Sequence, residues 1–392
     1  PWRYVMVAGS PGELLENNYF IQNLNEPNKL EDVSWIKPGK VIREVTLTTQ
    51  GGRACIDFAA RHNIQYVEFD AGWYGNEYDD KSDASTITVD PRRSPGPLDL
   101  HHVIEYGNQK GIGIILYVNR RALEKQIDEL LPLYKSWGIK GLKYGFVNVG
   151  PQEWTSWLHD AVRKAADHQL MVDIHDEYRP TGYSRTFPNL MTQEGIRGDE
   201  ETPSVKHSII TLFTRMIAGA GDNTNCYFAD RVSQSMGGKA GQMAKAIMLY
   251  SPWQFVYWYD RPSDSPHKKG GAGANETIIN ERSDLLFYDA LPTNWDETKV
   301  LEGEMGEYAT IARKSGNDWF IGSLAADQSR KVDIPLSFLD KGANYEALVY
   351  YQNGEDLKND EVRTEKIMVN RKSVVSKQLM KDSGLAMIIR KI

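Results

Sequence analysis

Short apolar runs alternate with amphipathic helical patterns through most of the chain, and this alternation constrains the fold more than any other feature. From about Trp35 the strand–helix unit repeats roughly every 30 to 35 residues, a spacing typical of βα units in a parallel sheet. The predicted strands are Val41–Leu47, Ile64–Asp70, Gly113–Val118, Lys140–Val147, Leu170–Ile174 and Asn189–Thr192. We therefore predict an α/β fold with a (β/α)8 TIM barrel over residues 35–294, and an open doubly wound sheet is the alternative.

The two ends of the chain differ in texture from this middle part. Beyond about residue 295, short alternating runs separated by Gly, Asn and Asp predict a C-terminal antiparallel β-sandwich domain over 295–392. Residues 1–34 contain one strand-like stretch, residues 2–8, and then a loop-like segment rich in Asn and Glu. We interpret them as the tail of an N-terminal β domain and a linker. Because the chain starts at Pro1 without a Met or an apolar leader, we expect a fragment or a processed product.

Composition disfavours several classes of partner. With 41% hydrophobic residues among 392, the chain has enough apolar material for a large core. Its net charge of -7 and the lack of any run of Lys or Arg weigh against nucleic acid. No apolar stretch reaches the roughly 18 residues of a membrane span, and no Gly-rich phosphate fingerprint follows an early strand. Cys55 and Cys226 lack the spacing of a metal knuckle, so we expect two buried free thiols, with one disulfide as the alternative.

The segment 170–201 concentrates charged residues at the ends of two predicted strands. These residues include His175, Asp176, Glu177, Glu194, Arg197, Glu200 and Glu201. Barrels and open α/β sheets carry their chemistry at the carboxyl ends of the strands. A solvated acidic loop is the alternative, since charge runs are often surface decoration. The basic residues among the acids, and Pro180 and Pro188, which stiffen the connection, favour a functional site.

Two other predicted strands also carry residues suited to a polar ligand. Asp70 ends one strand and is followed by Trp73, so the carboxylate could hold sugar hydroxyls while the indole packs on the sugar's apolar face. A capping role is the alternative for Asp70. In another strand, Lys143 and Gly145 face the same way. A buried Lys must meet a carboxylate or a substrate oxygen, and a Gly inside a strand often marks close approach of a ligand.

Carboxylates gathered in this way suit glycoside hydrolysis, in which two acids flank the scissile bond. We select Glu200 as the proton donor. Glu194 and Glu200, with Asp176 or Glu177, could also form an oxygen cage, because converging carboxylates repel one another without a cation. Ca²⁺ suits such a cage, since it takes about six to eight oxygen ligands, and Mg²⁺ is less natural there. Separate surface acids are the alternative.

Four stretches of the chain resemble glycoside hydrolase family 97. They are ENNYFIQNLNEP, YVEFDAGWYG, KGLKYGFVNVG and HDEYRPTGYSRTFPNLMTQEGIRGDE. The resemblance implies an N-terminal β-sandwich, a (β/α)8 barrel and a C-terminal β domain, with calcium at an active site that hydrolyses α-glucosides or α-galactosides. It also implies a periplasmic or secreted protein. We expect most of the N-terminal sandwich, which contributes a calcium-ligating carboxylate in the family, to be missing from this chain.

The resemblance also implies roles for individual residues. Glu200 matches the general acid of the family, and Glu194 and Glu200 match its calcium-ligating glutamates. Asp176 falls where inverting members have a base that also contacts calcium, and Glu177 could take that role after a small shift. Asn119 falls where inverting members have a second base glutamate, so that base is absent here. The substrate-binding candidates are Asp70, Trp73, Asn119, Lys143, His175 and Arg197.

Retaining α-galactosidases of the family carry a nucleophilic Asp in a Lys-x-Asp-Phe context, where this chain has Lys143, Tyr144, Gly145 and Phe146. We favour a calcium-dependent member of that branch, with Gly145, natural or engineered, in place of the nucleophile and therefore slow on terminal α-galactosides. The alternatives are an inverting α-glucosidase or α-galactosidase with Asp176 or Glu177 as base, and a catalytically weak carbohydrate-binding relative. A non-glycosidase, metal-dependent barrel enzyme is disfavoured, because His175 is the only strand-end histidine. Galactose or glucose preference and oligomeric state stay open.

Overall fold

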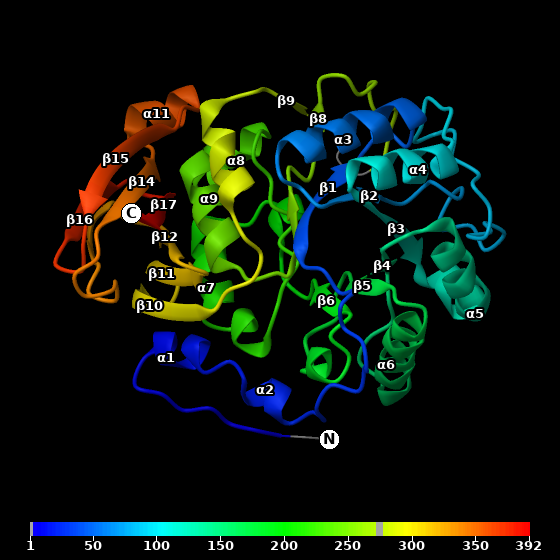
Figure 1. The fold of residues 1–392 in the computed structure, drawn as a ribbon, viewed down its shortest axis with the longest axis horizontal. Coiled ribbons are helices and arrows are strands. Elements are labelled where there is room, and N and C mark those ends of the chain that lie inside the picture. The colour runs from blue at the N-terminus through cyan, green and yellow to red at the C-terminus, as the bar shows by residue number, and fades with distance from the viewer. Residues whose placement is uncertain (1–2, 272–276) are drawn as a thin grey trace.

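The computed structural model describes residues 3–271 and 277–392, which form a parallel barrel followed by an antiparallel β domain (Figure 1). The barrel strands are β1 (Gly39–Glu44), β2 (Tyr66–Phe69), β3 (Gly113–Asn119), β4 (Gly141–Gly145), β5 (Met171–Ile174), β6 (Leu190–Gln193) and β7 (Trp253–Val256). They are hydrogen-bonded in the order β6-β5-β4-β3-β2-β1-β7, and every neighbouring pair is parallel.

The segment 222–226 spans the gap between β6 and β7. The Asp222 N–H donates to the Gln193 carbonyl on β6 (3.0 Å), and the Asn225 N–H donates to the Phe255 carbonyl on β7 (3.3 Å). Asn225 also forms an isolated parallel bridge with Val256. The segment thus stands where a (β/α)8 barrel has a further strand, although no strand was predicted there. The barrel is nearly closed, so the predicted TIM-like fold is confirmed and the open sheet is wrong.

Helices cover the outside of the barrel (Figure 1). They are α3 (Thr49–Arg61), α4 (Leu100–Lys110), α5 (Arg120–Trp137), α6 (Gln152–Asp167), α7 (Val205–Leu212), α8 (Asp230–Ser235), α9 (Gly238–Met248) and α10 (Leu286–Ala290). Thr48 and Asp99 accept backbone N–H groups as N-caps of α3 and α4. Gly111 and Gly138, both with left-handed φ, end α4 and α5. A short parallel pair, β8 (Asp260–Pro262) and β9 (Thr277–Ile279), follows β7.

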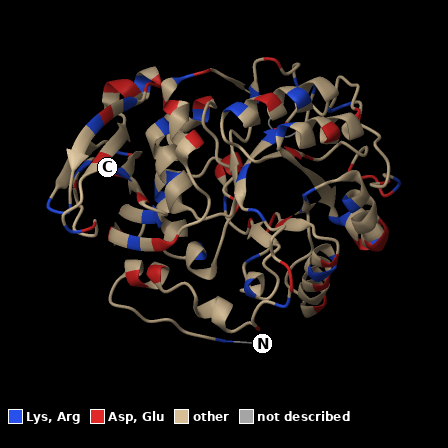
Figure 2. Ribbon diagram, in the orientation of Figure 1, with Lys and Arg blue, Asp and Glu red and all other residues tan. Residues whose placement is uncertain are grey.

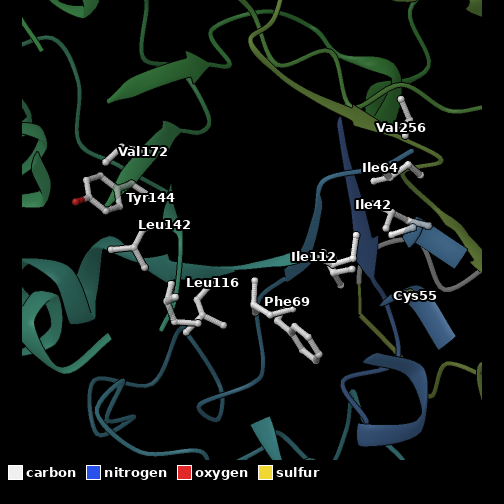
Figure 3. Packing of buried hydrophobic residues seen from close by; sticks show 14 of the residues in the cluster. Ile42, Cys55, Ile64, Phe69, Ile112, Leu116, Leu142, Tyr144, Val172 and Val256 are labelled. Atoms are coloured by element: carbon white, nitrogen blue, oxygen red, sulfur yellow. The ribbon is translucent and has the colours of Figure 1, made fainter. Parts of the chain in front are cut away.

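Alternation along the strands separates two kinds of core. Side chains of one cluster, between strands and helices, include Ile42, Phe69, Leu116, Leu142 and Val172 (Figure 3). A second cluster comes from the first halves of the strands and includes Val41, Ile115, Met171 and Trp253. The carboxyl ends of the strands are thereby left to polar side chains. Cys55 and Cys226 are buried free thiols, as expected.

The C-terminal domain is built on a six-stranded antiparallel sheet with the order β10-β11-β12-β17-β14-β15. Its elements are β10 (Glu297–Glu304), β11 (Tyr308–Ser315), β12 (Asp318–Ala325), β13 (Arg330–Pro335), β14 (Tyr345–Tyr351), α11 (Gly354–Asn359), β15 (Arg363–Val369), β16 (Val374–Leu379) and β17 (Ser383–Lys391). The large sheet packs against α9, and the β13–β16 pair shares an apolar core with it. The predicted C-terminal antiparallel β domain is confirmed.

The N-terminal segment differs from its prediction. Residues 11–16 and 20–23 form the short helices α1 (Pro11–Glu16) and α2 (Phe20–Asn23). The strand expected over residues 2–8 is wrong for the described residues 3–8, which have no regular structure. Val5 and Val7 are exposed there, and a short apolar run without a neighbouring strand does not form a stable sheet.

Acidic and basic positions are interspersed along both parts of the molecule (Figure 2). This distribution agrees with the absence of Lys and Arg runs in the sequence. Among the helices of the described residues, none is both long and apolar enough to cross a membrane.

Candidate active site

The carboxyl ends of the barrel strands bring together residues that lie far apart in the sequence. Asp70 follows β2, Asn119 ends β3, Gly145 ends β4, His175 follows β5 and Glu194 follows β6. In a parallel barrel these ends meet at one rim, and strand pairing sets Asn119 opposite Gly145. The strand-end residues selected from the sequence therefore share one end of the barrel.

His175, Asp176 and Glu194 form the tightest group at this rim. One ligand-capable atom from each lies within 4.8 Å of the other two. Glu194 Oε2 accepts the Asp176 N–H (2.6 Å) and lies 3.2 Å from His175 Nδ1. The Asp176 carboxylate accepts the N–H of Phe146, the residue after Gly145. Hydrogen bonds thus join the ends of β4, β5 and β6 at one point.

Burial changes the protonation of this group. Burial raises the pKa of Glu194 to about 10, and the nearby charges of Glu200 and Asp222 add to the rise. Burial also raises the pKa of Asp176, against the effect of the Phe146 N–H. The pKa of His175 falls well below its usual value because of burial and then the Lys143 charge. Burial therefore favours the neutral imidazole of His175 and disfavours the ionised forms of Glu194 and Asp176, and a cation bound near the two acids would oppose that effect on them.

Glu200 lies in the same cavity but outside that tight group. It belongs to the 3-10 helix η2 (Asp199–Glu201), and its N–H donates to Thr224 Oγ1 (3.1 Å). The cavity measures about 590 Å³, and its lining includes Asp176, Glu177, Arg179, Glu194, Arg197 and Glu200. Glu177 and Arg197 are exposed, and Arg197 pairs with Glu201. The carboxylates of Asp176, Glu194 and Glu200 interact electrostatically with one another.

The barrel interior holds further charges around Lys143, and sequence reasoning missed Glu68, Asp173 and Asp222 among them. Lys143 is 1% exposed, and its Nζ lies 3.9 Å from Asp222 Oδ2 and 4.0 Å from the centre of the Trp258 ring. Within the described residues, Lys143 Nζ and both carboxylates of Glu68 and Asp173 have no hydrogen-bond partner. Burial lowers the pKa of Lys143, but Asp222 and then Glu68 raise it by more, so the net shift is upward. These unmet polar groups give the interior a capacity to bind a polar ligand or water.

Asp70 is held in its charged form by a second cation of the interior. Arg43 Nε on β1 lies 2.6 Å from Asp70 Oδ2, and the Arg43 guanidinium stacks on Trp258 at 4.5 Å. Burial alone would raise the pKa of Asp70, but Arg43 and then Lys143 outweigh it and lower that pKa. An ionised Asp70 next to two cations can accept hydrogen bonds from ligand hydroxyls.

Some of these buried charged residues inside the barrel could have been predicted from the sequence. Glu68 stands two residues before Asp70, and Asp173 stands two residues before His175, so each pair faces the same side of its strand. Arg43 lies inside a predicted strand and could have been found by the same rule. Asp222 had no such signal, because the segment that carries it has no strand pattern.

Trp73 and Asn119 have positions that do not support the substrate contacts inferred from the sequence. Trp73 is fully buried, its indole N–H donates to the Tyr117 carbonyl (2.7 Å), and its ring packs against Tyr134 of α5. Asn119 Oδ1 accepts the Arg121 N–H (3.0 Å) and caps α5. The turn after β2 turns the indole into the core between strands and helices, and the helix start uses the amide oxygen. Both side chains are thus engaged within the fold, and Tyr78 and Phe146 take their place as candidates for contact with a sugar.

An exposed aromatic pair lies beside the carboxylates, and sequence reasoning missed it. The rings of Tyr78 and Phe146 are 5.4 Å apart and are 48% and 44% exposed by residue. Phe146 has a left-handed φ of +52°, which is uncommon for a bulky residue, and its N–H bonds Asp176. The Arg121 guanidinium lies 5.6 Å from the Tyr78 ring. This pair, rather than Trp73, presents apolar ring surface near the rim.

Arg215 supports the end of β6 from behind. Its guanidinium donates to the carbonyls of Glu194 (2.6 Å), Gly195 (3.1 Å), Gly219 (3.0 Å) and Ala220 (2.8 Å). Burial lowers the pKa of Arg215 to about 9, and nearby Arg179 adds to the fall. The arginine fixes the backbone that carries Glu194 and adds a positive charge close to it.

Two family sequence profiles match the chain. The profile described as Glycoside hydrolase 97 matches residues 34–196, and the one described as Glycosyl-hydrolase 97 C-terminal, oligomerisation, matches residues 294–390. The chain belongs to glycoside hydrolase family 97. The resemblance seen in the four sequence stretches is thereby confirmed.

Two curated relatives are named as α-galactosidases. A retaining alpha-galactosidase from Bacteroides thetaiotaomicron is 30% identical over 369 residues, which cover 86% of this chain and 52% of that protein. A probable retaining alpha-galactosidase from Streptomyces bingchenggensis is 29% identical over 348 residues, covering 86% and 51%. The chain therefore spans about half the length of these curated relatives.

Solved structures agree with the family. A Glycoside Hydrolase Family 97 enzyme from Pseudoalteromonas sp. strain K8 in complex with acarbose has a TM-score of 0.80 and 26% identity, covering 98% of this chain and 65% of that one. A beta-arabinopyranosidase has a TM-score of 0.73 at 18% identity, covering 96% and 59%, and this likeness concerns the fold alone.

Proposed function

We propose that this chain is the barrel and C-terminal part of a calcium-dependent glycosidase that cleaves terminal α-galactosides. The observation that carries the proposal is the convergence of carboxylates from three elements, Asp176 after β5, Glu194 after β6 and Glu200 on η2, around one cavity. The names of the curated relatives support galactose rather than glucose. Residues 35–294 would be the catalytic barrel, 295–392 the C-terminal domain, and 1–34 the tail of an upstream β-sandwich domain.

Glu194, Asp176 and Glu200 would hold the calcium ion. Carboxylate oxygens are the ligands that Ca²⁺ prefers. The raised pKa of Glu194, caused by burial and then by Glu200, shows that the nearby cations do not offset burial and the neighbouring acids, so a bound cation would favour the ionised carboxylate. Among His175, Asp176 and Glu194, the His175 nitrogen is poorly suited to Ca²⁺, which takes oxygen ligands. We therefore place His175 next to the ion and not among its ligands. The remaining oxygen ligands would come from water, substrate or an upstream domain. A bound ion would supply positive charge that keeps these carboxylates ionised and orients sugar hydroxyls.

Glu200 is the proposed proton donor to the leaving oxygen. Its half-buried side chain lies in the cavity, and its backbone is fixed by Thr224 and Arg231. Asp70 and Lys143 would hold the hydroxyls of the galactose ring, because an ionised carboxylate accepts and an ammonium donates strong hydrogen bonds. Lys143 has no hydrogen bond of its own among the described residues, so a sugar hydroxyl would satisfy it.

We propose a retaining lineage in which Gly145 stands at the nucleophile position, so that hydrolysis by the covalent route is impaired. One observation favours inversion as the second candidate mechanism. Asp176 is half-buried, its pKa is raised by burial, and its carboxylate is held by the N–H of the residue after Gly145. It could therefore activate a water on the face opposite Glu200. Glu177 is exposed and is the weaker choice of base.

Substrate, location and assembly follow the family. We propose an oligosaccharide or α-galactoside substrate and a periplasmic or secreted location. The description of the profile that matches residues 294–390 includes oligomerisation, and we propose self-association through the C-terminal domain.

The test is hydrolysis by the full-length protein, followed by proton NMR, of an α-galactosyl disaccharide and an activated aryl α-galactoside. Glu200→Gln should lower disaccharide turnover by about 100-fold or more, since general acid catalysis contributes about that factor, and should affect the aryl substrate much less. Glu201→Gln is the matched control, because Glu201 is exposed and pairs with Arg197. Equal disaccharide turnover by Glu200→Gln and its parent would contradict the proton-donor role. Release of the β-anomer first would select inversion.

A further inference from the structure

The space next to Gly145 is filled by a tyrosine. A Cβ added to Gly145 would lie closer than 3.0 Å to Cε2, Cζ and Oη of Tyr117, a separation that real Cβ atoms essentially never show. Tyr117 lies on β3, next to β4, where it pairs with Lys143, two residues before Gly145. The phenol ring thus occupies the volume into which any side chain at position 145 would begin.

Tyr117 is fixed in this position. The residue is 4% exposed. Its carbonyl accepts the Trp73 indole N–H (2.7 Å), and its hydroxyl lies 3.4 Å from Asn119 Nδ2. Because the ring is buried, an added side chain at Gly145 must displace it or the atoms packed around it. Gly145 and Tyr117 therefore specify each other: the ring requires the glycine, and a carboxylate at 145 would require a smaller residue at 117.

The phenol does not replace a carboxylate chemically. Burial raises the pKa of Tyr117 well above its usual value, and the negative charge of Asp70 adds to the rise. A protonated phenol is a hydrogen-bond donor and a poor nucleophile. The group in the nucleophile's space can therefore contact a sugar or a water, but it does not form a glycosyl ester as an aspartate would.

We propose that Tyr117 determines which group can attack the anomeric carbon. Its ring fills the space beside Gly145 in which a nucleophile would lie, so it excludes both a nucleophilic side chain on β4 and a small nucleophile that enters at the end of β4. This inference rests on the proposed glycosidase function. It adds that the space is filled by a matched partner, so that replacing Gly145 alone does not restore a retaining enzyme. It also implies that small external nucleophiles do not reach the anomeric carbon through the space beside Gly145 in the unaltered protein.

The first test is a double-mutant cycle that measures the Tm and does not require enzymatic activity. Gly145→Ala should lower the Tm by roughly 2–6 °C, as overpacking does, and this loss should disappear in a Tyr117→Ala background. Gly241→Ala is the matched control, because Gly241 is also buried but an added Cβ would meet nothing closer than 3.7 Å. An equal cost of Gly145→Ala in both backgrounds would overturn the proposal. Tyr117→Val serves in the same cycle if Tyr117→Ala does not fold.

The second test uses azide with 4-nitrophenyl α-galactoside. An azide nitrogen bonds to the anomeric carbon, the bond from that carbon to the aryl oxygen breaks, and nitrophenolate leaves with the electron pair. The parent and Tyr117→Phe, which keeps the ring, should form no β-galactosyl azide. Tyr117→Ala or Tyr117→Val should form it in an azide-dependent manner. Formation of the β-azide by the parent would refute the blocking role, as would failure of a folded Tyr117→Ala that still hydrolyses the substrate.

The third test restores the carboxylate. Gly145→Asp alone should not be labelled by a 2-fluorogalactosyl fluoride, whereas Gly145→Asp combined with Tyr117→Ala should be trapped as a covalent ester visible by mass spectrometry. Full labelling of Gly145→Asp alone would contradict the proposal. If the cost of Gly145→Ala still depends on Tyr117 but neither the parent nor any variant turns over substrate, the proposed glycosidase function is overturned. The role of Tyr117 in the reaction then falls with it.

Discussion

Replacing Lys143 with methionine should destabilise the protein strongly. The side chain is 1% exposed, its Nζ lies 3.9 Å from Asp222 Oδ2, and the carboxylates of Glu68, Asp70 and Asp173 also act on it. Methionine keeps most of the aliphatic volume but removes the charge. At this separation and an effective dielectric constant of about 20, one pair interacts with about 4 kcal/mol. Removing one partner of a buried pair costs about 3 to 5 kcal/mol, so we expect a loss in that range at neutral pH.

The loss should grow as the pH rises. Burial raises the pKa of Asp222 to about 6, and Lys143 opposes that rise. An acid whose folded pKa is raised supports the folded state below its unfolded pKa, and this contribution is lost as the pH rises through about 6. Without Lys143 the pKa of Asp222 rises further, so the charged form becomes costlier. Lys143→Met should therefore lose less stability at pH 5 than at pH 8.

Urea unfolding at the two pH values measures both effects. Lys206→Met is the matched control, since Lys206 forms an exposed ion pair with Asp327, and such pairs contribute little. A cost of Lys143→Met as small as that of Lys206→Met would refute the reasoning. A larger cost at pH 5 than at pH 8 would refute the electrostatic explanation specifically.

Three further predictions concern the metal, the aromatic pair and one histidine. Chelation by EDTA should lower the Tm of the parent, because a ligand that binds only the folded state stabilises it; Glu194→Gln should abolish that shift, and an unchanged parent Tm would contradict the calcium site. Tyr78→Ala and Phe146→Ala should each raise KM for a disaccharide by about three- to tenfold, the range of a stacking contact, but leave KM for galactosyl fluoride unchanged; equal increases for both substrates would argue against contact with the leaving sugar. The hydrogen bond to Asp289 raises the pKa of His62, so the contribution of this pair to the free energy of unfolding is present below pH 6.5 and lost as the pH rises through the raised pKa. Urea titrations should show that His62→Gln lowers this free energy more at pH 5.5 than at pH 9. A loss independent of pH would exclude the pair as the cause.

Much of the fold could be predicted from the sequence, because the strands that form the barrel carry continuous apolar runs between clear helix signals. The run Gly113–Val118, for example, lies within β3 (Gly113–Asn119). Prediction failed where tertiary pairing replaces local pattern. Residues 222–226 lie at a strand position because they hydrogen-bond to β6 and β7, and their own composition does not predict a strand. Residues 3–8 show the opposite case, since their apolar run forms no strand and has no partner strand in the described chain.

The candidate site was predictable to the level of strand ends and not to the level of side-chain direction. Asp176, Glu194 and Glu200 come to one cavity as expected from their places after β5 and β6. Trp73 could not be placed, because the turn after β2 decides whether its indole faces the rim or the core. The Tyr117 ring was missed for a related reason: it comes from the neighbouring strand, and cross-strand filling of a glycine leaves no mark in either sequence segment.

Helix α9 has a consequence for how this protein can be divided. All of its residues are buried, between the barrel and the C-terminal sheet, and an added Cβ at Gly322 of β12 would fall 2.7 Å from the Ala244 carbonyl of the helix. Truncation of the chain near residue 294 would expose the face of α9 that packs against the C-terminal sheet. Calorimetry should therefore record one cooperative unfolding transition for the two parts. In chimaeras between family members, the exchangeable module is the sheet together with α9, so sequence-defined domain borders are poor crossover points.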